Sequence, residues 1–440
     1  VAFFKMKWAH TEWRTLQLIV LTTVIYQAPA FCFHKPFRAS RVSLPDEVTY
    51  CAGRRTELSM SRMRGDDRNS PYRGLRILEL AGGLVPQGAL VKTARTGWRE
   101  LWKAMISELA PQSKDGAYQR PSYSFNGKIS ESSEFPVESG RYHLYTGNAC
   151  PWCHRVLLVA KLRGLLDGEK GPFLTHSILS DDPERASRGG WAFDKSRPDP
   201  AFGCRDLREV YDLCSPGFTG RCTAPLLVDR KKRKIVSNDS ASMMRMLNEI
   251  DPTAQGNGET SNDMKTVDLA PSKEKLAEMD DLDEYIYQKL SNGVYRCGFA
   301  TTQAAYEDAE AGVFEALDKL EEVLLKSRFL AGDHLTWSDL RLFPTLVRFD
   351  AVYTSLFKCS RRRVADYASL TSWLRDVYQI AGVSETIDIP DCRRSYFVQL
   401  FPLNPSGIIP AGPTIKELCL TECPGAALGR GKPGALKYKK

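Results

Sequence analysis

The chain has 440 residues and a mass of 49.4 kDa, with 42% hydrophobic and 26% charged residues, which excludes a disordered or collagen-like polymer and predicts two or three domains. A formal net charge of +8 is small for this length, so no dense basic surface for nucleic acid is expected. Twelve cysteines at irregular spacing indicate free thiols in a reducing compartment rather than a disulfide scaffold.

The first 30 residues have the pattern of a secretory signal: basic residues precede an apolar run at 18–25, and Ala-Pro-Ala at 28–30 is typical of a cleavage site. The run is far shorter than the roughly 20 residues that span a bilayer, so no stable membrane anchor is expected. Residues 31–87 contain many Arg and Ser residues and resemble a transit peptide. Together the two segments resemble the bipartite presequence of plastids acquired by secondary endosymbiosis. A plastid (chloroplast) location is therefore expected, with secretion or the cytoplasm as alternatives.

Residues 88–135 are interpreted as an N-terminal extension that carries one amphipathic helix at 97–105. Trp98, Trp102 and Met105 recur there at helical spacing. Their shared face is expected to pack on the main body of the protein.

Residues 136–250 alternate short apolar runs with helical patterns. This alternation predicts a domain in the order β-α-β-α-β-β-α. The predicted strands are 142–146, 175–179, 226–228 and 234–236, and the predicted helices are 151–165, 207–213 and 240–249.

A polar segment with Pro and Gly at 251–273 predicts a linker, and residues 274–413 have helical patterns throughout. Thr336 and Asp339 have the spacing of a capping box at the start of one helix. A preceding long helix is predicted from its single apolar stripe, formed by Val313, Leu317, Leu320 and Leu324.

Two basic segments are predicted to be solvated. Residues 414–440 are rich in Gly and Lys and are expected to form a tail. Residues 230–234 resemble a nuclear signal in composition, but they lie at the tip of the predicted hairpin, where such a run is usually a solvated turn.

The sharpest local feature is Cys150-Pro151-Trp152-Cys153-His154, between the first predicted strand and the first helix. Pro151 suits the first helical position, which puts Cys150 at the helix N-terminus. Unpaired N–H groups and the helix dipole favour a thiolate there, with a pKa of about 5 or 6. Cys150 is therefore the predicted nucleophile.

The motif also fits three other interpretations. Cys-x-x-Cys-His is also a haem attachment pattern, but its place at a strand-to-helix turn favours redox chemistry. Zinc needs a second ligand pair, which Cys204, Cys214 and Cys222 do not convincingly supply, so no metal is expected. Cys150 and Cys153 could also be inert core residues, a role that suits Cys153 best.

Two further motifs suggest a peptide ligand. Pro225 follows Thr223 and Ala224 just before the third predicted strand. In many thioredoxin-like sheets a proline at this place is cis, which would expose the backbone of Ala224; an ordinary strand-entry proline is equally possible. Asp239 and Ser240 join a carboxylate and a hydroxyl at a helix start, which suits an amino-acid head group but is also a plain N-cap.

These residues resemble the glutathione transferase superfamily, and specifically its xi class, the glutathionyl-hydroquinone reductases. The similarity covers residues 88–413. The resemblance implies an α/β thioredoxin-like N-terminal domain and an all-α glutathione-transferase C-terminal domain, assembled as a homodimer. The segments that carry it are 140–145, 149–152, 190–191, 220–225, 239–240, 292–295, 298–300, 341–350 and 404–410.

The resemblance also implies a reaction and its residues. Cys150 would attack the glutathione sulfur of a glutathionyl-hydroquinone, and a second glutathione, the co-substrate, would resolve the mixed disulfide. Tyr295 and Tyr396 would line the pocket for the aromatic, quinone-type substrate. The implied glutathione contacts are Trp191, the backbone of Ala224 at Pro225, Asp239 and Ser240 at the γ-glutamyl end, and Arg208 at the glycyl carboxylate.

Some residues depart from the family pattern. Many members have Ala or Ser at the position of Cys153, so a glutaredoxin-like dithiol reductase using Cys150 and Cys153 is an alternative. Asp239 replaces the usual Glu, and its side chain is shorter by one methylene group. From a different class, a non-catalytic binding module with the same fold stays possible.

Overall fold

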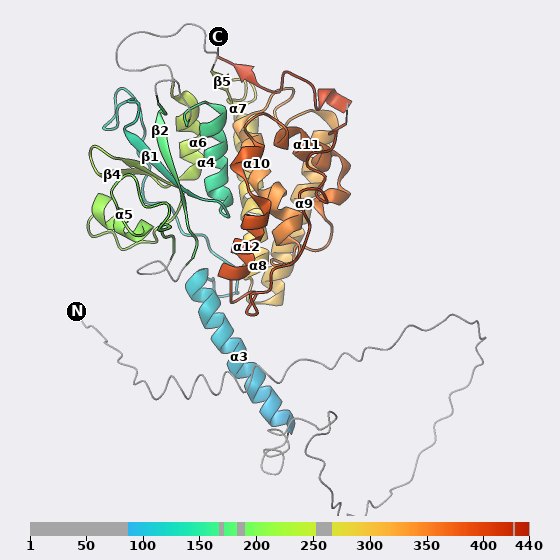
Figure 1. The fold of residues 1–440 in the computed structure, drawn as a ribbon. Helices are drawn as coiled ribbons and strands as arrows, with labels where there is room; N and C mark the ends of the chain where they lie inside the picture. The colour runs from blue at the N-terminus through green and yellow to red at the C-terminus, as the bar shows by residue number, and fades with distance from the viewer. Residues whose placement is uncertain (1–86, 167–170, 183–189, 252–265, 426, 440) are drawn as a thin grey trace, which may run out of the picture. The chain divides into compact units, whose positions relative to one another are not determined.

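The structure, a computed structural model, describes residues 87–166, 171–182, 190–251, 266–425 and 427–439 (Figure 1). The predicted signal segment and all but the last residue of the transit-like segment lie outside the described residues. The chain divides into two units, 1–101 and 102–440.

Helix α3 (Gln87–Leu109) contains the helix predicted at 97–105 and extends it in both directions. Within the second unit, the C-terminal part of α3 packs against other parts of the chain. Ile106 is fully buried, and the indole N–H of Trp102 donates to the backbone oxygen of Pro402 at 2.9 Å. The predicted packing of this part of the extension is therefore confirmed.

Four strands form one mixed sheet, in the spatial order β2-β1-β3-β4 (Figure 1). Strand β1 pairs parallel with β2 and antiparallel with β3, and β3 pairs antiparallel with β4. The central strand β1 is buried at every residue, as expected for a strand covered on both faces. The bounds are β1 (Tyr142–Gly147), β2 (Leu174–Leu179), β3 (Leu226–Asp229) and β4 (Lys234–Ser237).

Three helices complete this sheet domain: α4 (Pro151–Leu162), α5 (Leu207–Cys214) and α6 (Ser240–Glu249). Successive β1 side chains point to opposite faces of the sheet. Leu144 therefore joins the core with α4 and α6, and Tyr145 joins a second core with α5. The observed order is the predicted β-α-β-α-β-β-α.

The helical domain follows, and Figure 1 shows it beside α4. Its stripe of Val313, Leu317, Leu320 and Leu324 is fully buried, as predicted. Its elements are α7 (Leu276–Tyr285), η1 (Ile286–Ser291), α8 (Gly293–Phe299), α9 (Gln303–Lys326), α10 (Trp337–Arg348), η2 (Phe349–Tyr353), η3 (Val364–Asp366), α11 (Ala368–Tyr378), η4 (Ser384–Thr386) and α12 (Ile389–Gln399), where η marks short π or 3-10 turns. No described helix combines the length and apolarity that a membrane crossing requires.

The segment after residue 413 is packed, and the prediction of a solvated tail is wrong. Strand β6 (Lys437–Tyr438) pairs with β5 (Val267–Asp268), which lies in the predicted linker. Leu420 is fully buried because its apolar side chain packs into the helical core. Arg430 is also buried, since its guanidinium donates to the backbone oxygen of Ser327 at 3.1 Å. Turn η5 (Ala427–Gly429) lies in the same segment.

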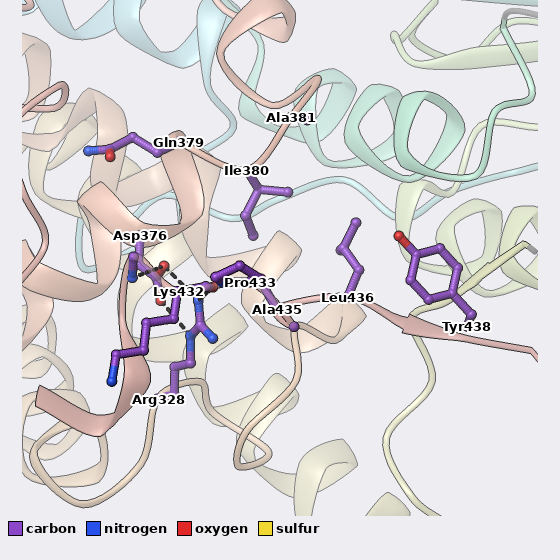
Figure 2. Close-up of a pocket in the computed structure, with 12 residues that line it drawn as sticks. Arg328, Asp376, Gln379, Ile380, Ala381, Lys432, Pro433, Ala435, Leu436 and Tyr438 are labelled. Atoms are coloured by element: carbon purple, nitrogen blue, oxygen red, sulfur yellow. Dashed lines mark hydrogen bonds and ion pairs between the residues drawn. The ribbon is translucent and has the colours of Figure 1, made fainter. Parts of the chain in front are cut away.

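The packed tail and the end of α11 border a cavity of about 330 Å³ (Figure 2). On one wall Arg328 and Asp376 form a buried ion pair at 2.9 Å. The guanidinium of Arg328 also donates to the backbone oxygen of Lys432 at 2.9 Å, which ties the tail to the helices.

The hairpin tip at 230–234 is exposed, as predicted, and it also forms ion pairs. Lys231 pairs with Glu138, and Lys234 pairs with Glu134, both in the segment before β1. Such surface pairs contribute little to stability.

The predicted capping box at α10 is present and is part of a larger buried network. The Asp339 carboxylate accepts from the backbone N–H of Thr336 at 3.0 Å, from the Leu330 N–H at 2.9 Å and from the Trp373 indole N–H at 3.0 Å. Asp339 is fully buried, so water cannot replace it as an acceptor for these donors.

We expect Asp339→Ala to lower the free energy of unfolding by about 3 kcal/mol or more, because it leaves several buried donors without an acceptor. Urea denaturation measures this change. The matched control is Asp333→Ala, at an exposed carboxylate six residues earlier, which should change stability by less than about 0.5 kcal/mol. Equal effects of the two substitutions would contradict the structural role of Asp339.

Candidate active site

Cys150 lies at the turn from β1 into α4, where the sequence predicted it. It is the N-cap residue of α4, with φ −76° and ψ 116°, and Pro151 occupies the first turn. Gly147 ends β1 just before this turn, and a Cβ there would lie 2.3 Å from the Trp191 ring. The glycine therefore lets the Trp191 indole pack directly on the turn that presents Cys150.

The environment of the Cys150 sulfur lowers the pKa of the thiol to about 7. Burial opposes ionisation, but hydrogen bonds from the Cys153 thiol and backbone N–H, the charge of Arg120 and the Trp152 N–H outweigh it. The direction agrees with the sequence prediction. The value is higher than the expected 5 or 6, because Cys150 is half-buried and the loss of water around its sulfur opposes ionisation.

Cys153 is a buried, neutral partner of Cys150. Its side chain is 1% exposed, and burial together with the adjacent Cys150 raises the pKa of its thiol well above the ordinary value. A protonated thiol can donate to a thiolate but is a poor nucleophile. The geometry thus supports a positioning role for Cys153.

Cys150 opens into a cavity of about 430 Å³ that both domains line. Trp191 comes from the sheet domain, whereas Tyr295 on α8 and Tyr396 on α12 come from the helical domain. The structure therefore brings together four of the predicted site residues. The cavity is lined by Leu109, Arg120, Ala149, Cys150, Trp152, Asp181, Gly190, Trp191, Arg221, Tyr295, Phe299, Ser395, Tyr396, Gln399 and Leu400.

The two predicted tyrosines form a phenol chain with a third that the sequence did not single out. The hydroxyls of Tyr295 and Tyr396 are 2.6 Å apart, and that of Tyr396 is 3.2 Å from the hydroxyl of Tyr353 on η2. Burial raises the pKa of both Tyr295 and Tyr396 well above the ordinary value. Both phenols therefore remain protonated and can donate to a ligand in the cavity.

Close packing fixes the position of this chain. A Cβ at Gly298 on α8 would lie 2.4 Å from the Phe357 ring. Phe357 in turn packs against Tyr295 and stacks on Tyr353, with ring centroids 5.2 and 5.3 Å away. Gly298 thus lets α8 approach close enough to hold Tyr295 over the cavity.

Arg120 is a site residue that sequence analysis missed. Its guanidinium lies over the Trp152 ring, 3.9 Å from the ring centroid, and lines the cavity. Its Nε–H is buried and has no hydrogen-bond partner among the described residues. No local pattern marks an arginine in an irregular segment, and only the fold brings Arg120 beside Cys150.

Of the glutathione contacts implied at the edge of the sheet, the Ala224 backbone lies next to Cys150. The peptide bond between Ala224 and Pro225 is cis, as predicted, and the Ala224 oxygen lies 3.8 Å from the Cys150 sulfur. Asp239 caps α6 by accepting from the Ala241 N–H at 3.0 Å. Ser240 is fully buried, and its hydroxyl accepts from the Arg155 guanidinium. Asp239 and Ser240 do not line the cavity.

The structure does not place Arg208 in the cavity. On α5 its guanidinium donates to Asp212, one helical turn away, at 3.0 Å, and to the Phe218 backbone oxygen at 2.7 Å. The i, i+4 spacing of Arg208 and Asp212 explains this local pairing. Arg221 lines the cavity instead. Across the described ranges no three His, Cys, Asp or Glu side chains are grouped as metal ligands would be.

Two family models match the chain. The model described as glutathione S-transferase, N-terminal domain, matches residues 149–250, and the one described as glutathione S-transferase, C-terminal domain, matches residues 303–376. The first range contains Cys150, and the second contains α10 and most of α11.

Curated relatives and solved structures agree with these models. Glutathionyl-hydroquinone reductase YqjG of Escherichia coli is 37% identical over 328 residues, which cover 72% of this chain and 93% of the relative. Glutathionyl-hydroquinone reductase PcpF of Sphingobium chlorophenolicum is 38% identical over 321 residues, 72% of this chain and 94% of the relative. The glutathione-bound structure of YqjG has a TM-score of 0.59 at 38% identity and covers 68% of this chain and 94% of its own. The Xi glutathione-S-transferase of Phanerochaete chrysosporium has a TM-score of 0.61 at 35% identity, with coverage of 69% and 94%.

We expect the rate of Cys150 alkylation by iodoacetamide to rise with pH through a midpoint near 7, because only the thiolate reacts. Cys153→Ala removes the thiol donor and should move the midpoint up by about one unit. Peptide mass spectrometry follows Cys150 among the other thiols.

The control for this titration is Cys214→Ala, at a buried thiol on α5, which should leave the Cys150 midpoint unchanged. A parent midpoint at about 8.5, the value of a free cysteine, would contradict the assignment of Cys150 as an activated thiol.

Proposed function

Because this chain belongs to the xi class of the glutathione S-transferase family, we propose that it is a glutathionyl-hydroquinone reductase that uses glutathione as its co-substrate. One observation carries the proposal. The activated sulfur of Cys150 and the phenol pair of Tyr295 and Tyr396 line the same cavity, which is large enough for an aromatic ring.

In the first step the Cys150 thiolate attacks the glutathione sulfur of the substrate. The substrate reacts as its keto tautomer, in which a proton has moved from a hydroxyl to the ring carbon that carries the sulfur. A sulfur–sulfur bond forms, the bond from that sulfur to the ring carbon breaks, and its electron pair passes through the ring to the carbonyl oxygen. A proton taken up by this oxygen completes the hydroquinone. The ring carbon is reduced, and the two sulfurs are oxidised to a mixed disulfide of glutathione with Cys150.

In the second step the thiolate of another glutathione attacks the glutathione sulfur of the mixed disulfide. Cys150 leaves as a thiolate, which its hydrogen bonds and the charge of Arg120 stabilise, and glutathione disulfide is released. The net reaction converts one glutathionyl-hydroquinone and one glutathione into one hydroquinone and one glutathione disulfide. A leaving group with a lowered pKa speeds this step.

The phenols act on the oxygen atoms of the substrate. When the carbon–sulfur bond breaks, negative charge develops on the hydroquinone oxygen conjugated with that carbon. Tyr295 and Tyr396, both protonated, can donate to this oxygen, and donors in a buried site stabilise such charge strongly.

Glutathione itself would bind along the sheet edge next to Cys150. The Trp191 indole would cover the peptide, and the Ala224 backbone at the cis bond to Pro225 would pair with it as a strand does. Asp239 and Ser240 would meet the γ-glutamyl end through the N-terminus of α6. At the cavity wall Arg120 adds a cation that has no acidic partner among the described residues.

A dithiol disulfide reductase is the second candidate, favoured by the hydrogen bond from the Cys153 thiol to the Cys150 sulfur. In that reaction the Cys153 thiolate would displace glutathione from Cys150. The raised pKa and 1% exposure of Cys153 favour the route with a second glutathione.

A plastid location and a homodimer complete the proposal. The signal-like and transit-like segments of the sequence support plastid import, and a mature N-terminus well beyond residue 31 in mass spectrometry is the expected result.

Four large apolar side chains of one segment are exposed, which supports association of two copies: Val398, Phe401, Ile408 and Ile409. Sedimentation analysis measures the oligomeric state of the protein in solution.

Cys150→Ser should lower turnover of glutathionyl-menadiol by about a thousandfold or more, because serine is not ionised near pH 7 and cannot form the disulfide. Cys153→Ser should keep most of the parent activity on the same substrate. Steady-state kinetics of both variants provide the measurement. If instead Cys153→Ser alone abolished turnover, the second candidate function or a different nucleophile would be favoured.

Tyr396→Phe should lower kcat/KM for glutathionyl-menadiol by about 100-fold, because it removes a donor to the developing oxygen charge and frees Tyr295 from its partner. Formation of the Cys150 mixed disulfide from glutathione disulfide should be unchanged, since no phenol takes part in it. The control is Tyr306→Phe on α9, where the hydroxyl donates to the Lys358 backbone oxygen at 2.8 Å. Equal kinetics of Tyr396→Phe and the parent would rule out the proposed role of the phenol.

A further inference from the structure

A fully buried arginine, Arg348, lies beneath the catalytic turn, and the mechanism above does not use it. It is the last residue of α10 in the helical domain. In the described part of the chain no Asp or Glu pairs with its guanidinium. Its hydrogen bonds run to neutral acceptors: the backbone oxygens of Asn148, Ala149 and Pro344, a ring nitrogen of His154 and the thiol of Cys392.

Two of these bonds hold the residues directly before Cys150. Arg348 Nε donates to the Ala149 oxygen at 3.0 Å, and Nη2 donates to the Asn148 oxygen at 2.8 Å. The planar guanidinium thereby fixes two successive carbonyls with one rigid group. A residue of the helical domain thus sets the conformation of the turn that the sheet domain supplies.

A third bond fixes the first turn of α4. Arg348 Nη1 donates to Nδ1 of His154 at 2.9 Å, so the proton of the neutral ring lies on Nε2, which donates to the Thr386 hydroxyl at 2.8 Å. Burial and then the charge of Arg348 lower the pKa of His154 well below its ordinary value. His154 therefore stays neutral, and the cation at Arg348 keeps its full charge.

The same cation lies close to the groups that react or stabilise charge. Its charge lowers the pKa of Tyr353 and of Tyr396, partly offsetting the larger effect of burial. It also acts on the buried thiol of Cys153. The titratable groups that face Arg348 are Cys153 and His154 on α4, Tyr295 on α8, Tyr353 on η2, and Cys392 and Tyr396 on α12.

A buried guanidinium without a counterion is costly for the folded protein, and neutral acceptors offset that cost only in part. The cost falls when an anion forms nearby. In the reaction proposed above, anions form at two places: on the Cys150 sulfur, in the residue that follows the two carbonyls held by Arg348, and on the hydroquinone oxygen, which would meet Tyr396, a phenol on which the charge of Arg348 acts.

We propose that Arg348 is a positioning residue of the active site, which holds the 148–150 turn so that the Cys150 sulfur faces the phenol pair and supplies the positive charge for the anions formed there. The hydroquinone part of this inference rests on the proposed function. The part that concerns the Cys150 thiolate does not.

The test compares Arg348→Met, Arg348→Lys and a matched control, Arg328→Met. Arg328 is buried like Arg348, but it pairs with Asp376 in the wall of the other cavity (Figure 2). Three quantities are measured for each folded variant: thermal stability, the pH midpoint of Cys150 alkylation, and kcat/KM with glutathionyl-menadiol.

Arg348→Met should raise the alkylation midpoint of Cys150 by about one unit and lower kcat/KM by about 100-fold. Arg348→Lys should restore the midpoint, because the charge is retained, but only part of kcat/KM, because an ammonium lacks the planar fork that bridges two carbonyls. Arg328→Met should lose stability to a similar extent and keep both the midpoint and kcat/KM.

The proposal is overturned if Arg348→Met keeps the alkylation midpoint of the parent protein and its kcat/KM is no lower than that of Arg328→Met. Should Arg348→Met fail to fold, Arg348→Lys decides alone: kcat/KM equal to that of the parent refutes the positioning role, and a loss of about tenfold or more supports it. Should the parent itself not turn over glutathionyl-menadiol, the proposed function fails, and the alkylation midpoints still decide the role of Arg348.

Discussion

The proposed chemistry depends on the balance between burial and hydrogen bonding at the Cys150 sulfur. Cys150 is half-buried, and the desolvation of its sulfur by itself would keep the thiol protonated. Donors from Cys153 and the first turn of α4, together with the Arg120 charge, reverse that tendency and bring the pKa to about 7. A sulfur in this range combines a large thiolate fraction at neutral pH with high nucleophilicity and serves equally well as a leaving group.

The two domains contribute different parts of the chemistry. The sheet domain supplies the sulfur, its hydrogen-bond donors and the edge at Ala224, where an extended peptide could pair. The helical domain supplies the phenols of Tyr295 and Tyr396 and the buried cation at Arg348. Two glycines allow this assembly, since Gly147 admits the Trp191 ring against the catalytic turn and Gly298 admits Phe357 against α8.

Charge in the site is distributed unevenly. Arg120 and Arg348 are cations without acidic partners among the described residues, whereas the thiol of Cys153 and the phenols around the cavity are neutral in their resting forms. Anions that form during turnover would therefore meet fixed positive charge and protonated donors. In a buried cavity such fixed groups act more strongly than they would in water.

The sequence by itself determined the features that depend on neighbouring residues. Pro151 after Cys150 set the helix start, the stripe from Val313 to Leu324 set a buried helix face, and the spacing of Thr336 and Asp339 set a cap. Each depends on contacts within a few residues or on a regular period, and each is present as predicted.

Only the tertiary structure decided which distant residues meet. Arg120 and Arg348 have no local pattern that marks them, yet folding brings Arg120 beside the Cys150 sulfur and Arg348 onto the Ala149 carbonyl that precedes it. The pairing of Arg208 with Asp212 kept that arginine out of the cavity, and burial of Leu420 drew the tail onto the helices, although composition predicted a solvated segment. Long-range packing and burial set these outcomes, and with them the pKa of the thiol, because desolvation is a property of the whole fold and not of the motif.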